Sequence, residues 1–516
     1  MELSKTKRRI MIGLACPVLL VAFFYLEEDW RGWHAWHKFK HQCEVQGERF
    51  DLPSVVPPPV PDDQNFAMTP IVVSCYGQML DATGHEINPR NTNLVNRLQI
   101  SCQRENEHGT PPKIGSWQKA AFTDLEPWQR YYRRLADSPS GNSDADGFPV
   151  GQQPQTPAAD VLLALSKYNS VIEELREASR LPQSRFPLEY DKEDPAAILL
   201  PHLAALKRCS LVLQLRAIAE LQNGSAGKAL DDVKLILRLS NSIRTEPPLI
   251  SQLVRLAILQ IAIQPIWEGL AEHRWSEPQL ADLDQALSGF DFVAGYRLAM
   301  HSEMAFQEGI LRFLRRHPKQ FLELMSADEN RHKSEAEIFV SDCLVLHLVP
   351  GGWFYQNQLY CARAMEKYYL PLADVRQQTF APARERQAGA AVDREFKHPG
   401  PFNLWAIMML PGLGNSARKF AFGQCTADLA RVACALERYR LALDGYPTNL
   451  EALVPRCLDH LPHDIIGGGP LNYRQTLDGR FLLYSVGWNE KDDDGELVLK
   501  KDGAVDLDQG DWVWRY

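Results

Sequence analysis

The chain has 516 residues, which is long enough for about three domains. Apolar residues make up 45% and charged residues 23%, which is ordinary for a protein that buries a core and excludes a disordered, collagen-like or many-span membrane protein. The 56 basic and 65 acidic side chains give a net charge of −9, so no basic excess is present to neutralise a phosphate backbone, and nucleic acid is not an expected partner.

The first predicted element is a membrane-spanning helix. A basic segment over 5–9 precedes an apolar run over 10–26. At a rise of about 1.5 Å per residue, this run is just long enough to cross a hydrocarbon core. Because positive charge stays on the cytoplasmic side, we expect the N-terminus in the cytoplasm and everything after residue 27 outside. Trp30, Trp33 and Trp36 follow the run, where indole rings suit the headgroup layer.

Three other interpretations of this segment stay open. A cleaved signal peptide requires small residues after the apolar core, whereas this core ends in the bulky stretch 23–26. A lipid-modified Cys16 is disfavoured because apolar sequence continues well beyond it, and a buried soluble helix leaves the flanking charges and tryptophans unexplained. The favoured interpretation is a single-pass protein of a bacterial inner membrane, with its bulk in the periplasm.

A polar helix is expected over 31–50, directly after the membrane. His34, His37 and His41 fall on one of its faces. This spacing could bind a metal, and the alternative is a histidine-bearing surface without one. The proline-rich stretch 55–61 then predicts a stiff spacer that holds the body away from the bilayer.

The region 66–158 is predicted to be mixed and partly loop. Its apolar patches, 71–76 and 94–102, could each be a strand, and 136–158 has the composition of a loop. Cys75 and Cys102 are the one cysteine pair that could form a disulfide in an oxidising compartment. The cysteines on apolar helical faces look like small core residues, and these are Cys209, Cys343 and Cys434.

From 159 to 400 the apolar period becomes that of helices, which predicts an α-helical body. The expected helices cover 162–175, 196–221, 229–243, 250–271, a segment capped by Ser276, 292–315, 336–348 and 352–375. Short breaks between them predict antiparallel neighbours. The segment 219–239 loosely resembles one tetratricopeptide hairpin. A helical binding scaffold and a domain that packs only on itself both stay open.

Residues 401–516 carry the most specific pattern. A long helix to about residue 443 and a short helix at 450–454 are followed by two expected strands, 471–474 and 480–487. The turn residues Asp478 and Gly479 between these strands are a hairpin signal. A last strand is expected over 510–516.

This order of elements resembles the globular part of the major pseudopilin of type II secretion systems. The residues that carry the resemblance are Leu436, Glu437, Tyr439, Arg440, Gly445, Tyr446, Pro447, Thr448, Leu461, Pro462, Asp464, Tyr473, Arg474, Tyr484, Ser485 and Gly487. The resemblance implies a small α+β module at this end of the chain and a link to secretion or pilus-like assemblies. The apolar run over 402–413 is too short to span a bilayer.

The same resemblance implies a calcium site in the loop after the strand over 480–487. The corresponding segment here, 488–496, is rich in carboxylates, which suit the oxygen-only coordination of calcium. We expect side-chain ligands from this segment and the last strand: Asn489, Asp492 and Asp494 first, then Asp493 and Asp511. A solvated acidic loop that binds no metal stays open as the alternative.

The expected fold is mainly α, in five parts: a membrane anchor at 1–27, a juxtamembrane helix and spacer at 28–65, the mixed region at 66–158, the helical body at 159–400 and the α+β module at 401–516. No nucleophile elbow, zinc-protease motif, phosphate-binding loop or dinucleotide fingerprint is present, so no catalytic residue and no small-molecule substrate are predicted.

Two functional hypotheses follow from this organisation. The favoured one is a membrane-anchored, extracytoplasmic and non-catalytic scaffold or interaction protein of the envelope, with protein partners. The alternative is a membrane-tethered hydrolase with its site between the helical body and the C-terminal module.

Overall fold

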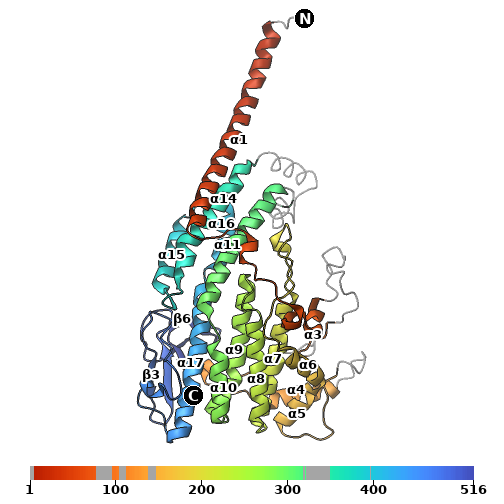
Figure 1. The fold of residues 1–516 in the computed structure, drawn as a ribbon, viewed down its shortest axis with the longest axis vertical. Coiled ribbons are helices and arrows are strands. Elements are labelled where there is room, and N and C mark those ends of the chain that lie inside the picture. Colours follow the sequence, from red (N-terminus) through yellow and green to blue (C-terminus); the bar gives the residue numbers. More distant parts are fainter. Residues whose placement is uncertain are drawn as a thin grey trace.

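The computed structural model describes residues 5–76, 96–103, 112–137, 147–317, 320, 349–395 and 397–516. It is 61% helical and 7% strand, so the prediction of a mainly α protein is confirmed. Figure 1 shows one long helix that projects from a body of helices lying side by side, with most of the strands gathered at one side. The helix predicted over 336–348 and the predicted core role of Cys343 lie outside the described residues.

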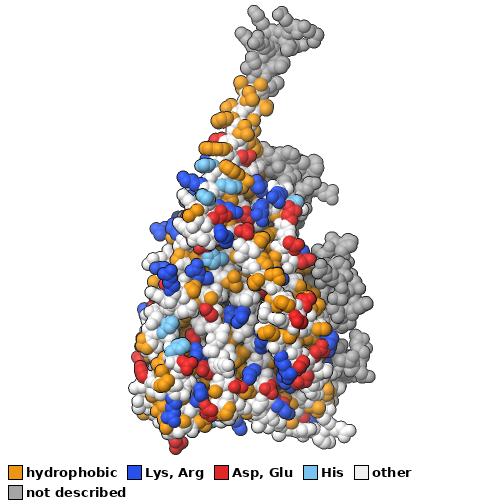
Figure 2. Space-filling model, in the orientation of Figure 1, with side chains coloured by type: hydrophobic (Ala, Val, Ile, Leu, Met, Phe, Trp, Pro, Cys, Tyr) orange, Lys and Arg blue, Asp and Glu red, His pale blue; other side chains and the backbone are white. Residues whose placement is uncertain are grey.

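The projecting helix is α1 (Lys5–Val45), which contains the predicted membrane span and continues without a break into the body (Figure 1). Its apolar side chains over 18–26 are mostly exposed, and Leu20 and Leu26 are each 70% exposed. Figure 2 shows hydrophobic side chains along this projecting part. Further along the same helix Trp36 is buried, so the body of the protein begins within α1 itself.

The body is built from helices that pack around one hydrophobic core. In chain order they are α4 (Glu126–Asp137), α5 (Pro157–Leu165), α6 (Asn169–Ala178), α7 (Pro201–Gln222), α8 (Ala226–Ser242), α9 (Leu249–Ala271), α10 (Glu277–Ser288) and α11 (Phe292–Arg316). Local sequence sets where several begin: Thr156 caps α5, and Ser276 forms a capping box with Gln279 at the start of α10. The helices predicted over 250–271 and 292–315 are confirmed.

The helix predicted over 352–375 is shorter than expected. It corresponds to α14 (Gly351–Ala364), which widens into a π-helical turn over Met365–Tyr369. A short 3-10 turn over Leu370–Leu372 follows, and Pro371 within it has no N–H with which to continue a helix.

Two segments of the body, Pro195–Gln222 and Leu249–Ala271, are long and apolar enough to cross a membrane by length and composition. Side chains such as Leu213 and Ile263 on these helices are fully buried against other parts of the body. Such burial is typical of core helices in a folded domain, whereas the apolar part of α1 has no such cover among the described residues.

The long helix predicted in the C-terminal module is α17 (Ser416–Leu443), and it lies within the body. It packs against α9, α10 and α11 (Figure 1). Arg431 on α17 pairs with Asp284 on α10 at 2.9 Å, and Thr426 accepts a hydrogen bond from Gln260 on α9. The helical body and the C-terminal region therefore share one core.

The strands form small antiparallel sheets. They are β1 (Ala373–Asp374) with β2 (Thr379–Phe380), β3 (Asn472–Gln475) with β4 (Phe481–Ser485) and β7 (Trp512–Trp514), and β5 (Leu497–Leu499) with β6 (Val505–Gly510). Asn472 lies opposite Tyr484, and Gly479 takes a positive φ of 78° in the turn between their strands. The predicted hairpin and last strand are confirmed. The described chain also contains the helices α2 (Leu52–Val55), α3 (Pro70–Val73), α15 (Pro382–Glu395) and α16 (Leu404–Met409).

Three expectations for the N-terminal region are wrong. The patch 71–76 is helical, because Pro70 stands at the first position of a helical turn that Thr69 precedes. The described part of 94–102 forms turns and no strand. The proline-rich stretch 55–61 is not a spacer, since Arg185 donates to the Pro57 carbonyl at 3.0 Å and α1 itself joins the projecting segment to the body.

Candidate functional site

The junction between the projecting helix and the body is built from backbone contact. We call it the anchor joint, and it comprises Glu28, Asp29 and Gly32 of α1 with Gly351, Gly352 and Trp353 of α14. A Cβ atom on Gly32 would overlap the Gly352 carbonyl, and one on Gly352 would overlap the Glu28 carbonyl. The two helices can approach this closely only because both positions are glycine.

Polar groups hold the anchor joint in register. Asp29 accepts a hydrogen bond from the Gly352 N–H at 2.6 Å, which places a carboxylate at the N-terminus of α14, where the helix dipole favours it. Glu28 is almost fully buried and accepts from the Trp353 indole at 3.1 Å and from Arg31. The acidic residues after the predicted membrane span therefore fasten α1 to the body.

The acidic loop, residues 488–496, is folded around a buried carboxylate. Asp511 is 1% exposed and accepts hydrogen bonds from the N–H groups of Asp493 and Gly495, the latter at 2.7 Å. Asn489 donates to Asp493 at 2.7 Å. Burial raises the pKa of the Asp511 carboxyl to about 6, and the charges of Asp493 and Asp492 act in the same direction.

The structure brings together only some of the predicted calcium ligands. Asn489, Asp493 and Asp511 are linked by hydrogen bonds, whereas Asp492 accepts from the Tyr484 hydroxyl at 3.0 Å and Asp494 lies on the surface facing Arg474. Their oxygen atoms are the donors that calcium prefers. Among the described residues, no three histidine, cysteine or acidic side chains stand close enough together to hold a metal ion.

The histidines and cysteines singled out by sequence have other surroundings. The His37 ring packs tilted against Trp33 and its Nδ1 lies 2.8 Å from the Trp33 carbonyl, while His34 stacks on Trp30. Cys75 and Cys102 are both buried free thiols, so the disulfide that the sequence left open is not formed in this structure. Both sit inside the core, where burial raises the pKa of each to about 12 and disfavours the reactive thiolate.

Residues that carry the pseudopilin resemblance have structural roles here. The Asp464 carboxylate is buried and accepts from the Ser485 hydroxyl at 2.7 Å and from the Val486 N–H. Glu437 accepts from Arg440 at 2.7 Å and from the Tyr446 hydroxyl at 2.9 Å. These bonds tie the segments after α17 to the helix and to β4.

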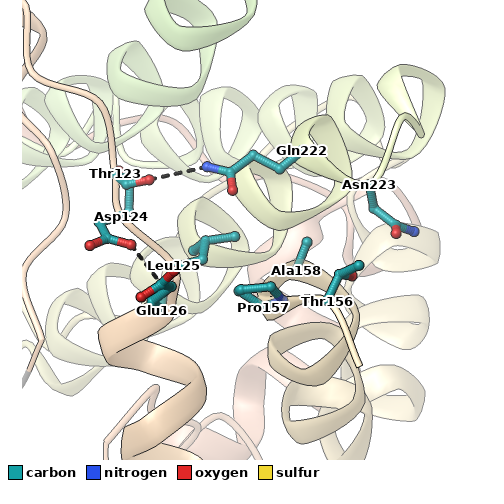
Figure 3. A pocket seen from close by; sticks show the side chains of 9 residues that line it. All are labelled: Thr123, Asp124, Leu125, Glu126, Thr156, Pro157, Ala158, Gln222 and Asn223. Carbon is teal, nitrogen blue, oxygen red and sulfur yellow. Dashed lines mark hydrogen bonds between the residues drawn. The ribbon is translucent and has the colours of Figure 1, made fainter. Parts of the chain in front are cut away.

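A pocket of about 370 Å³ lies where the N-terminal ends of α4 and α5 meet the end of α7 (Figure 3). Gln222 donates to the Thr123 carbonyl at 3.1 Å across it, and Asp124 accepts from the Glu126 N–H. Thr123 is fixed from behind, because its hydroxyl and its N–H both donate to the buried Glu268. Gln222, Asp124 and Thr123 therefore all have hydrogen-bond partners within the chain.

A second cavity of about 480 Å³ adjoins the first and shares Asn223 with it. We call it the charged pocket, and it is lined by Arg176, Arg216, Glu220, Asn223, Lys228 and Asp232. It lies between α6, α7 and α8. Asp232 at its base binds Arg176 at 2.7 Å and Arg216 at 3.1 Å. Burial raises the pKa of Asp232 to about 6, and the two arginines act against this shift.

A third hollow of about 330 Å³, the arginine cleft, lies between the end of α1, α11 and α15. Its charged lining comprises Glu48, Arg297, Glu366, Asp374, Arg376 and Arg384. His301 lies 2.9 Å from Glu48, and burial lowers the pKa of His301. His301 therefore lies beside the cleft but is not part of its lining, and the cleft is not between the body and the C-terminal module, where the alternative hydrolase site is predicted. The hydrolase stays a prediction.

No known protein family, no curated protein and no solved structure matches this chain. The resemblances to a pseudopilin and to a tetratricopeptide hairpin therefore stay predictions. Sequence analysis missed the anchor joint and the charged pocket. The only local signal for the anchor joint was Gly32, which stands between tryptophans. No local signal marked Glu220 in the charged pocket, because its burial depends on how α6 and α8 pack.

Proposed function

We propose that this protein is a membrane-anchored scaffold whose helical body lies outside the cytoplasm and offers its surface to protein partners of the cell envelope. The observation that carries the proposal is α1, whose exposed apolar part passes without a break into the anchor joint. A rigid joint holds the body in one orientation to the bilayer, which suits a protein that presents a surface at a fixed height.

The anchoring part of this proposal predicts membrane association that depends on the centre of the apolar run. Leu20→Arg should shift the full chain from the membrane pellet to the supernatant after an alkaline wash, because an arginine at mid-span costs about 2.5 to 3.5 kcal/mol on insertion scales. Val45→Arg is the matched control, since Val45 is also exposed but lies at the other end of α1. Equal extraction of wild type and both variants would contradict the proposal.

Calcium binding by the acidic loop is a separable part of the proposal. Calcium competes with protons for carboxylates, and the Asp511 pKa is about 6. We expect calorimetry on the full chain to show tighter calcium binding well above this pH than well below it. Asp493→Asn should weaken binding about tenfold, whereas Asp502→Asn, in the turn between β5 and β6, should not. If calcium produced neither heat nor a higher melting temperature at high pH, the site would be ruled out.

A further inference from the structure

Two arginines of the charged pocket, Arg176 and Arg216, have partners of opposite charge within the chain. Asp232 is 1% exposed and holds both arginines, while Arg216 also donates to Asn169 and Arg176 to Glu173. The buried carboxylate thereby fixes two guanidinium groups in the wall of the cavity. Because their charges are compensated by Asp232 and Glu173, these groups shape the pocket without requiring a ligand.

Glu220 is the buried charged group of this pocket that has no partner of opposite charge. It is 6% exposed, and its Oε2 atom is buried without a hydrogen-bond partner. Glu220 forms no ion pair with any described residue: Arg176 and Arg216 of the same pocket pair with Asp232 instead, and Asp232 has the same sign as Glu220. A buried carboxylate without a partner is costly. Its position in the lining of a cavity of about 480 Å³ leaves room for a partner from outside the chain.

A positive charge also lines the same cavity. Lys228 is exposed near the start of α8 and forms no ion pair with any described residue. Arg176 also has a buried Nε atom without a partner. Once the groups held by Asp232 are set aside, the pocket offers Glu220 as a negatively charged acceptor and Lys228 as a positively charged donor.

We propose that the charged pocket binds a small zwitterion of the free amino acid class, with its ammonium group on Glu220 and its carboxylate toward Lys228. A ligand with only one kind of charge would satisfy one side of the pocket and leave the other side unpaired. A volume of about 480 Å³ lies in the range of small-molecule pockets and is ample for one amino acid. This inference does not depend on the membrane anchor.

The test uses the full chain in detergent, with each standard amino acid as a probe. Ethylamine and acetate serve as half-ligands that carry one charge each. We expect at least one amino acid to release or absorb heat on titration and to raise the melting temperature, and we expect neither half-ligand to do so at the same concentration. No heat and no shift from any amino acid would overturn the proposal.

Two variants separate a binding role of Glu220 from a structural one. Glu220→Gln removes an unpartnered buried charge, so the ligand-free protein should melt at a higher temperature while affinity falls about tenfold or more. Lys228→Met, at the surface, should also weaken binding. Lys207→Met on α7 is the matched control and should bind as the wild type does. A Glu220→Gln protein that is less stable and binds normally would show that Glu220 only supports the fold.

Discussion

Replacing Gly32 with leucine should break the anchor joint and lower the free energy of unfolding by about 3 kcal/mol or more. Any side chain at this position overlaps the backbone of α14 at Gly352, and a helix backbone cannot move aside as a flexible side chain can. The helices must separate, which also removes the hydrogen bond from Gly352 to Asp29. Urea unfolding of the detergent-solubilised chain measures the loss.

The control for this prediction lies on the same helix. A Cβ atom on Gly13 would meet no heavy atom within 4 Å, so Gly13→Leu should leave the stability of the body unchanged. Limited proteolysis gives a second measurement, because a released α1 should be cleaved between the predicted membrane span and the body. If both glycine variants unfolded at the same urea concentration as the wild type, the close packing of α1 on α14 would be wrong.

Trp267→Ala should destabilise the protein by about 3 to 5 kcal/mol. Trp267 on α9 is fully buried, and its indole donates to the Arg515 carbonyl at 2.8 Å. Its ring also packs against Phe122 and Tyr516. Removal of this side chain opens a cavity and releases the end of the chain from the helical body.

Circular dichroism during urea unfolding, with Trp30→Ala as the control, measures this effect. Trp30 is 65% exposed on the projecting helix, so its loss should change the free energy of unfolding little. A Trp267→Ala protein as stable as the Trp30→Ala protein would mean that the C-terminal strand does not share the core of the body.

The elements that sequence predicts well are those whose signals are local. The apolar period over 250–271 marks α9, and Asp478-Gly479 marks the turn between β3 and β4, because helix periodicity and turn chemistry depend on neighbouring residues. The strand expected over 71–76 is wrong because its local signal is ambiguous. Its apolar residues suit either a strand or a buried helical turn, and Pro70 favours the helical turn.

The sites depend on contacts between residues far apart in the chain, and their signals are therefore weak. Gly32 meets Gly352 across more than half of the sequence, and no pattern around either residue names the other. Glu220 looks like an ordinary solvated carboxylate on α7 until packing buries it. Asp511, a lesser candidate among the calcium ligands, is the residue around which the acidic loop folds, because its strand carries it inside.

The most direct test of the anchored, extracytoplasmic arrangement is an alkaline phosphatase fusion after Tyr516, assayed in intact bacterial cells. Phosphatase is active only outside the cytoplasm, so the full-length fusion should be active and a fusion that lacks 10–26 should be inactive. An inactive full-length fusion that accumulates to normal levels would place the body in the cytoplasm and contradict the account.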